Sequence, residues 1–447
     1  MIQILVGAAA SGSGKTTFTM GLMRALTRRG LKVQPFKCGP DYIDTQFHTI
    51  ASGRQSVNLD TWMASAEHVR SVYSHYAAGA DAAVVEGVMG LFDGYDRMRG
   101  SSAEIASLLD VPVLLVLNAR SAAYSVAALL HGMKTFRPDV RTAAVVFNNV
   151  SSESHYVFLK EAASDAGVEC LGWIPHTDGI EVPSRHLGLT LGVENELDAL
   201  ADRAADLIEA HVDVDRLVSL GEQEVMGDGS GCSVRESADS VGDSGAIRPF
   251  GTDDRPFVTA VAMDRAFNFC YRENLDRLAE MGDVRFFSPL AGEGLPEADF
   301  VYLPGGYPEL FAQELSLNRS LASQLAEYAE KGGRILAECG GMMFLSRSIT
   351  DMEGKAWPMA GVLPIECTMH GARLHLGYRS IEHGGKVFRG HEFHYSRIVN
   401  PDVLPNTVVQ TNARGVPTDT ALYRYRNVIA GYTHWYWGEN DIFDLWE

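Results

Sequence analysis

The sequence predicts an α/β protein of two domains, the first of them a P-loop domain with a doubly wound parallel sheet. Three observations support this prediction. The chain has 447 residues, which is more than a single core usually holds, and 46% of them are hydrophobic. Its first half alternates short β-rich apolar runs with longer helical stretches. A glycine-rich loop joins the first apolar run directly to the first helical stretch.

Five apolar runs of the first half have the length and composition of buried strands. They are IQILVGA at 2–8, KVQPFK at 32–37, AAVVEGV at 82–88, VPVLLVLNA at 111–119 and TAAVVFNNV at 142–150. The stretch 16–29, which follows the first run, has a helical pattern. Strands that alternate with helices pair in parallel and carry helices on both faces, so we expect a doubly wound sheet.

A change in composition separates the two halves of the chain. Residues 222–254 are poor in large apolar side chains and rich in glycine, serine and aspartate, as flexible linkers are. The predicted organisation is a first domain at 1–220, a linker at 221–255 and a second domain at 256–447. The second domain is also expected to be α/β, because three β-rich runs are each followed by a helix-like stretch. These runs are FVTAVAMD at 257–264, FVYLPGG at 300–306 and RILAECGG at 334–341.

Charge, apolar runs and cysteines restrict the classes of function. A formal net charge of −19 opposes general attraction to nucleic acid or anionic membranes, so no nucleic-acid partner is expected. The apolar run at 110–119 is shorter than the roughly 20 residues that cross a bilayer, so no membrane association is expected. The first ten residues lack the basic start of a signal peptide, and the cysteines show no C-x-x-C spacing. We therefore expect a cytoplasmic protein with reduced cysteines. Whether it forms a homodimer stays open.

A phosphate-binding loop is predicted between the first strand and the first helix. Residues 9–16 read AASGSGKT, in which Ala9 stands at the place of the usual first glycine. Gly12 and Gly14 let backbone N–H groups face phosphate oxygens, and Lys15 neutralises the phosphate charge. A glycine-rich turn without a ligand is the alternative interpretation. The residues predicted to bind ATP are Ser11, Gly12, Ser13, Gly14, Lys15, Thr16 and Thr17.

Acidic segments after later strands are candidates for the chemistry on the nucleotide. Asp41 and Tyr42 lie in KCGPDYID, whereas Glu86 and Asp93 lie in VVEGVMGLFDG. In an open parallel sheet these strand ends converge near the phosphates, so the four residues are predicted to activate a substrate carboxylate. Thr16, Glu86 and Asp41 are the predicted Mg²⁺ ligands. The alternative makes Asp41 a turn residue and Asp93 a solvated loop residue, whereas Glu86 ends an apolar strand and needs a partner.

A nucleophilic cysteine is predicted in the second half. RILAECGGMMFLS places Cys339 on a sharp turn between a strand-like run and a helix-like run, where the helix N-terminus favours thiolate. Backbone N–H groups of Gly306 and Gly340 are the predicted oxyanion hole. His434, at the end of the strand-like segment VIAGYTH, is the predicted base. The alternatives are a buried structural cysteine, an ordinary glycine turn and a structural histidine.

These residues and their order carry a resemblance that covers essentially the whole chain. The segments concerned are SGSGKTT, KCGPDYID, VVEGVMGLFDG, MDRAFNFCYRENL, LPGGYPE, ECGGM, GHEFHYS and GYTH. The chain resembles the cobyrinate a,c-diamide synthase family, which are ATP-dependent glutamine amidotransferases of cobalamin biosynthesis. The resemblance implies a synthetase domain similar to dethiobiotin synthetase, followed by a class I glutamine amidotransferase-like α/β domain.

The resemblance also implies a reaction. Cys339 would attack glutamine with His434 as base, and the released ammonia would pass internally to the synthetase site. There ATP would convert a carboxylate of a cobyrinate-type tetrapyrrole into an acyl phosphate, from which ammonia displaces phosphate to give the amide. The family repeats this step at the c and a side chains. The resemblance further implies that four residues in motifs shared with the family activate substrate or bind Mg²⁺. They are Asp41, Tyr42, Glu86 and Asp93.

One departure from the class I pattern, the identity of the substrate and two rival functions stay open at this point. Tyr436 stands two positions after His434, where fuller class I sites have a glutamate, so a Cys–His dyad is expected. Nickel-sirohydrochlorin and hydrogenobyrinate are alternative substrates that the residues do not separate from cobyrinate. A P-loop ATPase switch of the partition-protein type would need a lysine where Ala10 stands, and it gives no role to Cys339. A ligase whose second half is only an interaction module is likewise disfavoured by the intact cysteine and histidine.

Overall fold

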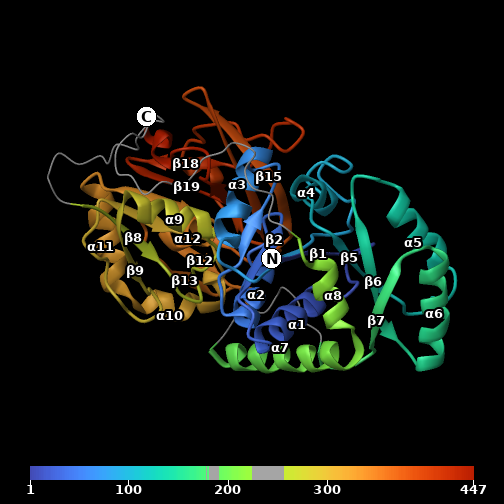
Figure 1. Ribbon diagram of the computed structural model, residues 1–447. Helices are drawn as coiled ribbons and strands as arrows, with labels where there is room; N and C mark the ends of the chain where they lie inside the picture. Colours follow the sequence, from blue (N-terminus) through green and yellow to red (C-terminus); the bar gives the residue numbers. More distant parts are fainter. Residues whose placement is uncertain (178, 181–190, 224–255) are drawn as a thin grey trace. The chain divides into compact units, whose positions relative to one another are not determined.

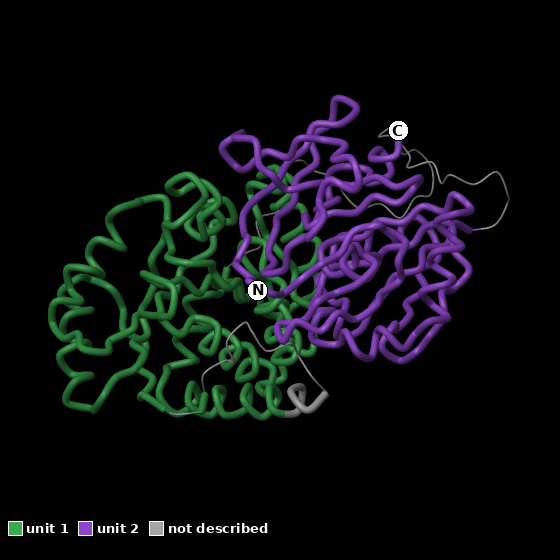
Figure 2. The backbone as a smooth tube through the Cα atoms, turned by 180° about the vertical axis from the view of Figure 1, so that it is seen from behind, with its two compact units in different colours: residues 1–236 green, residues 237–447 purple. Residues whose placement is uncertain are grey.

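The computed structural model describes residues 1–177, 179–180, 191–223 and 256–447. The chain divides into two compact units, Met1–Glu236 and Ser237–Glu447, which are green and purple in Figure 2. Most of the predicted linker, 224–255, lies outside the described residues, so the predicted domain boundaries stay predictions. At the start of this linker Glu222 forms a β-bridge with Ile2, so the chain there still belongs to the first unit.

The first unit is built on a seven-stranded sheet in which all neighbouring strands are parallel. Its strands are β1 (Ile2–Gly7), β2 (Val33–Cys38), β3 (Val57–Leu59), β4 (Ala82–Glu86), β5 (Val113–Asn118), β6 (Thr142–Val150) and β7 (Glu169–Pro175). Their spatial order is β3-β2-β4-β1-β5-β6-β7, so the chain winds first to one side of β1 and then to the other (Figure 1). The predicted doubly wound parallel sheet is confirmed, with β3 and β7 as additional edge strands.

Helices cover both faces of this sheet. They are α1 (Lys15–Arg28), α2 (Asp44–Ser52), α3 (Ala66–Ala77), α4 (Ser102–Leu109), α5 (Val126–Thr135), α6 (Glu153–Asp165), α7 (Leu191–His211) and α8 (Val214–Gly221). Ile4 of β1 packs in one core with apolar residues of α1, α7 and α8, whereas its neighbour Gln3 accepts a hydrogen bond from Tyr73 of α3. The two residues point to opposite faces, as successive strand residues do. Helices α1 and α7 lie side by side (Figure 1). Arg28 of α1 pairs with Asp206 of α7 at 2.6 Å.

The register of the central strands gathers the predicted site residues at one edge of the sheet. Glu86, at the end of β4, lies opposite Val6 of β1 and Lys37 of β2. The glycine-rich loop follows β1 directly, and the segment that contains Asp41 and Tyr42 follows β2. Carboxyl ends of parallel strands therefore bring these segments together, as the doubly wound architecture requires.

The second unit has a six-stranded sheet of order β18-β19-β11-β10-β8-β9, in which only β18 is antiparallel to its neighbour. Its strands are β8 (Phe257–Ala262), β9 (Gly282–Phe287), β10 (Phe300–Leu303), β11 (Arg334–Glu338), β18 (Leu422–Tyr425) and β19 (Val428–Gly431). Helices α9 (Arg272–Met281), α10 (Ala312–Leu317), α11 (Arg319–Glu330) and α12 (Gly340–Leu345) accompany it. The three predicted strands β8, β10 and β11 are present, and this unit is α/β as expected.

Two smaller sheets complete the second unit. One is antiparallel and consists of β15 (His375–His383), β16 (Lys386–His394) and β20 (Thr433–Tyr436). The other consists of β12 (Ser348–Thr350), β13 (Ala356–Pro358), β14 (Glu366–Thr368) and β17 (Arg397–Ile398). Across the part of the chain that the structure describes, no helix is long and apolar enough to span a membrane.

Candidate active sites

The loop after β1 has the backbone geometry of a phosphate-binding loop. Gly12 and Gly14 adopt φ angles of 75° and 87°, which glycine reaches without steric cost. Gly14 also has no room for a side chain, because a Cβ there would lie 2.1 Å from Nδ2 of Asn148. Lys15 begins α1 directly after this turn, so the first N–H groups of the helix are available to an anion.

The other predicted ATP contacts lie around the same loop. Ser11 is exposed, and Thr17 is half-buried in the first turn of α1. Ser13 is buried, and its hydroxyl donates a hydrogen bond to the Ala10 carbonyl at 2.8 Å. That bond closes the loop on itself and presets its shape for phosphate.

Lys15 and Thr16 connect the loop to the segment after β4. The buried Lys15 side chain donates through Nζ to the Met89 carbonyl at 2.6 Å. Burial lowers the pKa of Lys15, although the Glu86 carboxylate acts in the opposite direction. Thr16 Oγ1 donates to Glu86 Oε1 at 2.8 Å, so the structure brings two of the predicted magnesium residues into direct contact.

Glu86 is fully buried, and two basic residues that the sequence did not suggest hold its carboxylate. Lys37 Nζ lies 2.9 Å from Oε1, and His48 Nε2 lies 2.6 Å from Oε2. Lys37 also pairs with Asp44 at 2.5 Å. Burial opposes the charge on Lys37, but the carboxylates of Asp44 and Glu86 outweigh it and raise its pKa. Burial likewise opposes the charge on Glu86, whose pKa is nevertheless lowered by Lys37. The result is a preorganised, charged network directly behind the phosphate loop.

We expect Lys37→Met to destabilise the first unit by about 3 kcal/mol or more, because two buried carboxylates would lose their shared cation. The measurement is the midpoint of urea unfolding followed by circular dichroism, compared between variants because two units need not unfold together. Lys134→Met is the matched control, since Lys134 is exposed on α5 of the same unit. That substitution should change the stability by no more than about 0.5 kcal/mol. Equal midpoints for the two variants would contradict the charged network.

The remaining candidates of the acidic segments have different surroundings. Asp41 Oδ1 accepts hydrogen bonds from the backbone N–H groups of Ile43 and Asp44, at 2.9 and 3.0 Å, so one carboxylate oxygen shapes the turn into α2. Tyr42 is buried. Asp93 is exposed, and its Oδ2 accepts a hydrogen bond from the backbone of its own loop. The turn and loop interpretations of both aspartates therefore describe part of what these side chains do, and their roles toward substrate stay predictions.

Cys339 occupies a strained turn between β11 and α12. Its φ of 46° and ψ of −105° lie outside the regions that non-glycine residues normally adopt, a conformation that costs about 1–3 kcal/mol. The backbone N–H of Cys339 is fixed by the Gly431 carbonyl at 2.7 Å. Gly341 permits the turn, because a Cβ there would lie 2.1 Å from the Leu303 carbonyl oxygen. This is the geometry of a nucleophile elbow.

The thiol itself differs from the expectation of a helix-stabilised thiolate. Cys339 is buried, and burial raises its pKa well above the usual value, with the Glu309 carboxylate acting in the same direction. The helix that follows, α12, has only six residues, so its dipole is short. Burial therefore favours the neutral thiol over the thiolate, and a base is needed to ionise it.

One loop after β10 approaches both the cysteine turn and the predicted base. A Cβ on Gly340 would lie 3.0 Å from the backbone nitrogen of Gly306, so the two predicted oxyanion residues are neighbours. A Cβ on Gly305 would lie 2.1 Å from Cε1 of His434, so the imidazole packs directly against the same loop. The structure therefore brings Gly306, Gly340 and His434 together beside the elbow that carries Cys339.

His434 lies on β20 and is completely buried. Burial lowers its pKa well below the usual value, and the neighbouring His391 acts in the same direction. His391 lies opposite His434 in the β16–β20 ladder and stacks on it, with ring centroids 5.1 Å apart. Tyr271 lies 2.8 Å from Nδ1 of His391 through its hydroxyl oxygen. The imidazole of His434 is therefore neutral, the state that a general base requires.

We expect Gly305→Ala to lower glutaminase activity by at least about tenfold, because the new methyl group would displace the His434 imidazole. Ammonium-dependent activity should persist, since the first unit is untouched. Gly132→Ala on α5 is the matched control, because a Cβ there meets nothing within 4 Å. Unchanged glutamine hydrolysis in the Gly305 variant would argue against His434 as the base.

Two protein-family models match the chain. The CobQ/CobB/MinD/ParA nucleotide binding domain matches residues 4–189, and the CobB/CobQ-like glutamine amidotransferase domain matches residues 258–442. A solved chain described as "Crystal structure of glutamine amidotransferase" is 18% identical, over 39% of this chain and 89% of that chain. Its TM-score of 0.29 is too low to support an argument.

Curated relatives extend over nearly the whole chain. The "Cobyrinate a,c-diamide synthase" of Picrophilus torridus is 38% identical over 98% of this chain and 96% of its own. The "Hydrogenobyrinate a,c-diamide synthase" of Brucella abortus is 38% identical over 97% of this chain and 98% of its own. A further "Cobyrinate a,c-diamide synthase", of Listeria innocua, is 40% identical over 89% of this chain and 87% of its own. The chain belongs to the cobyrinate a,c-diamide synthase family.

Membership of the a,c-diamide synthase family confirms the predicted resemblance and the predicted pair of domains, a P-loop domain and a glutamine amidotransferase domain. It also confirms a ligase that combines nucleotide binding with glutamine amidotransfer, and it implies a metal ion associated with the nucleotide. The separate roles of the site residues rest on the geometry above and stay predictions.

Two further residues lie close in sequence to the predicted cysteine and histidine, Tyr436 after His434 and Glu338 before Cys339. Tyr436, which stands where fuller class I sites have a glutamate, donates its hydroxyl to Glu273. Glu338 precedes the cysteine, and its carboxylate accepts hydrogen bonds from Trp435 N and Tyr302 Oη at 3.0 and 2.7 Å. Burial raises the pKa of Glu338 to about 8. This residue ties β11 to β20 and holds the strand of His434 beside the elbow, a link that sequence reasoning missed.

Proposed function

We propose that the chain amidates the a and c side-chain carboxylates of cobyrinate, with ATP as the activating nucleotide and glutamine as the nitrogen donor. The observation that supports the proposal is that one chain assembles two groups of candidate reacting residues. One is the P-loop with its buried Lys37–Glu86 network, and the other is the Cys339 elbow with His434 and the Gly306 loop. The curated relatives that the chain matches over nearly their whole length are named cobyrinate and hydrogenobyrinate a,c-diamide synthases. These names link the two groups of residues to the amidation of corrinoid carboxylates.

The glutaminase half follows from the geometry of the elbow. The neutral His434 imidazole accepts the thiol proton as the Cys339 sulfur attacks the glutamine carboxamide carbon. Backbone N–H groups of Gly306 and Gly340 stabilise the oxyanion of the tetrahedral intermediate. The proton returns to the leaving nitrogen, ammonia departs and a glutamyl thioester remains. Water then hydrolyses the thioester to glutamate and restores the thiol.

In the synthetase half, the substrate carboxylate attacks the γ-phosphate of ATP, giving an acyl phosphate and ADP. Ammonia from the glutaminase centre attacks the acyl carbon, phosphate leaves and the carboxylate has become a primary amide. Lys15 neutralises the charge on the transferring phosphoryl group. Ser11, Ser13, Thr17 and the loop glycines bind the phosphate chain through the backbone N–H groups and hydroxyls of the loop.

Mg²⁺ is the proposed nucleotide-associated metal, and the oxygen donors of Thr16, Glu86 and Asp41 suit it. Bound Mg²⁺ would neutralise phosphate charge during transfer. Because Lys37 and His48 already hold the Glu86 carboxylate, we propose that Glu86 chiefly orients the Thr16 hydroxyl. Asp41, with Tyr42 and Asp93, would then position the substrate carboxylate.

We further propose a cytoplasmic enzyme whose partners are ATP, glutamine and a cobyrinate-type tetrapyrrole, without nucleic-acid or membrane partners; a homodimer is the proposed assembly. Hydrogenobyrinate and nickel-sirohydrochlorin are the alternative substrates for the same chemistry. A P-loop ATPase switch is the distant alternative, and the assembled glutaminase residues disfavour it.

The deciding experiment supplies ATP, Mg²⁺ and glutamine together with cobyrinate, hydrogenobyrinate or nickel-sirohydrochlorin, and identifies products by mass spectrometry. We expect two successive amidations of cobyrinate, with glutamate and phosphate formed in proportion and no amide when ATP is omitted. Faster amidation of another macrocycle would reassign the substrate within the same reaction class. ATP hydrolysis without an amide product from any macrocycle would favour the switch and contradict the proposal.

A further inference from the structure

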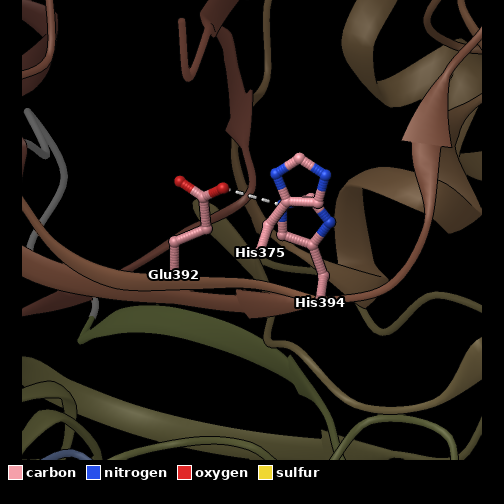
Figure 3. A group of neighbouring side chains, drawn as sticks. All are labelled: His375, Glu392 and His394. Carbon is pink, nitrogen blue, oxygen red and sulfur yellow. Dashed lines mark hydrogen bonds and ion pairs between the residues drawn. The ribbon is translucent and has the colours of Figure 1, made fainter. Parts of the chain in front are cut away.

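Three potential metal ligands, none of them among the reacting residues assigned above, lie together at the end of the β15–β16 hairpin. His375 and His394 are paired in register across the two strands, and Glu392 precedes His394 by two positions on the same face. One ligand atom from each residue lies within 4.8 Å of the other two. Figure 3 shows the two imidazole rings one above the other, with the carboxylate directed at His394. Glu392 and His394 are buried, whereas His375 is exposed.

Both ring nitrogens of His394 face hydrogen-bond acceptors. Nδ1 lies 2.8 Å from the Ser396 carbonyl oxygen, and Nε2 lies 2.9 Å from Glu392 Oε1. Because a carbonyl oxygen carries no proton, Nδ1 must donate to it. Nε2 is then the nitrogen that faces the carboxylate oxygen of Glu392. Two acceptors at this separation require either a further proton or a cation between them.

The groups behind these ligands are those that hold metal ligands in place. Oε2 of Glu392 accepts hydrogen bonds from Arg379 Nε at 2.7 Å and Thr420 Oγ1 at 2.5 Å, which leaves Oε1 for the shared position. Metal-binding histidines usually donate their other nitrogen to a backbone carbonyl or a carboxylate, as His394 does to Ser396.

We propose that His375, Glu392 and His394 bind one divalent transition-metal ion of the Zn²⁺, Co²⁺ or Ni²⁺ class. Two imidazoles and one carboxylate suit such ions, whereas Mg²⁺ prefers oxygen ligands alone. The ring of His375 stacks on that of His394, with centroids 5.0 Å apart and planes 3° from parallel. Because His375 is exposed, its ring is free to turn its nitrogen toward the other two ligand atoms. With three protein ligands, such an ion keeps a further coordination position for solvent or a small ligand.

The test uses the whole protein after treatment with a chelator, titrated with Co²⁺ alone and followed by the visible absorption of the bound ion. We expect one Co²⁺ per chain, displaced by Zn²⁺, and an affinity at least about tenfold lower in both His375→Ala and His394→Ala. His383→Ala is the matched control, because His383 lies on the same strand at the other end of the hairpin, opposite Lys386. This control should bind Co²⁺ as the unchanged protein does. Circular dichroism checks that each variant is folded.

A second variant separates this site from the reactive thiol. The carbonyl of Phe393, between the two buried ligands, lies 3.9 Å from Sγ of Cys339, so a thiol-bound ion is the nearest competitor. Cys339→Ser should keep full Co²⁺ binding if the proposal holds. Loss of binding in Cys339→Ser, undiminished binding in His375→Ala, or no stoichiometric binding by the unchanged protein would each overturn it. In the last case an imidazolium–carboxylate pair accounts for the contact between His394 and Glu392.

Discussion

Replacing the side chain of Cys339 by a methyl group, in Cys339→Ala, should abolish glutamine-dependent amidation while amidation with added ammonium salt persists. In the proposed mechanism the elbow supplies ammonia by covalent catalysis, and loss of a nucleophile costs on the order of 10⁴-fold or more in rate. In the same mechanism, activation of the carboxylate depends on Lys15 and its loop in the other unit, which the substitution leaves unchanged. Amide is measured with glutamine and, separately, with ammonium at elevated pH, where more of the nitrogen is unprotonated ammonia.

His434→Ala is the companion variant for this experiment. It should retain more residual glutaminase than Cys339→Ala, because a fraction of the thiol still ionises without its base. That fraction is small here, since burial raises the pKa of Cys339 well above its usual value. Full glutamine-driven activity in Cys339→Ala would refute the nucleophile. Loss of both activities in a folded protein would show that the two centres do not work independently.

The parts of the fold that the sequence predicted are those that a local pattern specifies. The phosphate loop has a fixed spacing between a strand and a helix, and two of its glycines adopt positive φ angles that side chains disfavour. The elbow at Cys339 likewise has a strand, small residues and a helix in immediate succession. The antiparallel strands β15 and β16 were not predicted. Buried and exposed residues alternate only weakly along each of them, so the sequence lacks the period-of-two pattern that indicates a half-buried strand.

The residues that sequence reasoning missed depend on contacts between distant segments. Lys37 interrupts an apolar strand run, and a buried charge there requires a partner, which is the argument that singled out Glu86. Applied to both signs of charge, that argument would have paired Lys37 with Glu86. No comparable signal marks His48, or the approach of Gly305 to His434, because neither neighbour is recognisable before the strands are placed.

The second large effect is expected at the phosphate loop. Lys15→Ala should abolish amidation with either nitrogen source, by on the order of 10²–10³-fold or more, because the transferring phosphoryl group loses its adjacent positive charge. Hydrolysis of glutamine by the elbow should remain, since Cys339 and His434 belong to the other unit. The fold should also survive, because the hydrogen bond that the Lys15 side chain donates to the Met89 carbonyl is worth only about 1 kcal/mol.

This variant and Cys339→Ala therefore form a reciprocal pair: one loses both amidation activities and keeps glutaminase, and the other loses glutaminase and keeps ammonium-dependent amidation. Lys32→Ala is the control for the lysine, because Lys32 is exposed just before β2 in the same unit and should leave all three activities unchanged. The readouts are amide by mass spectrometry, ADP release and glutamate formation. Undiminished amidation in Lys15→Ala would remove the P-loop from the reaction, and carboxylate activation would have to be sought at another centre.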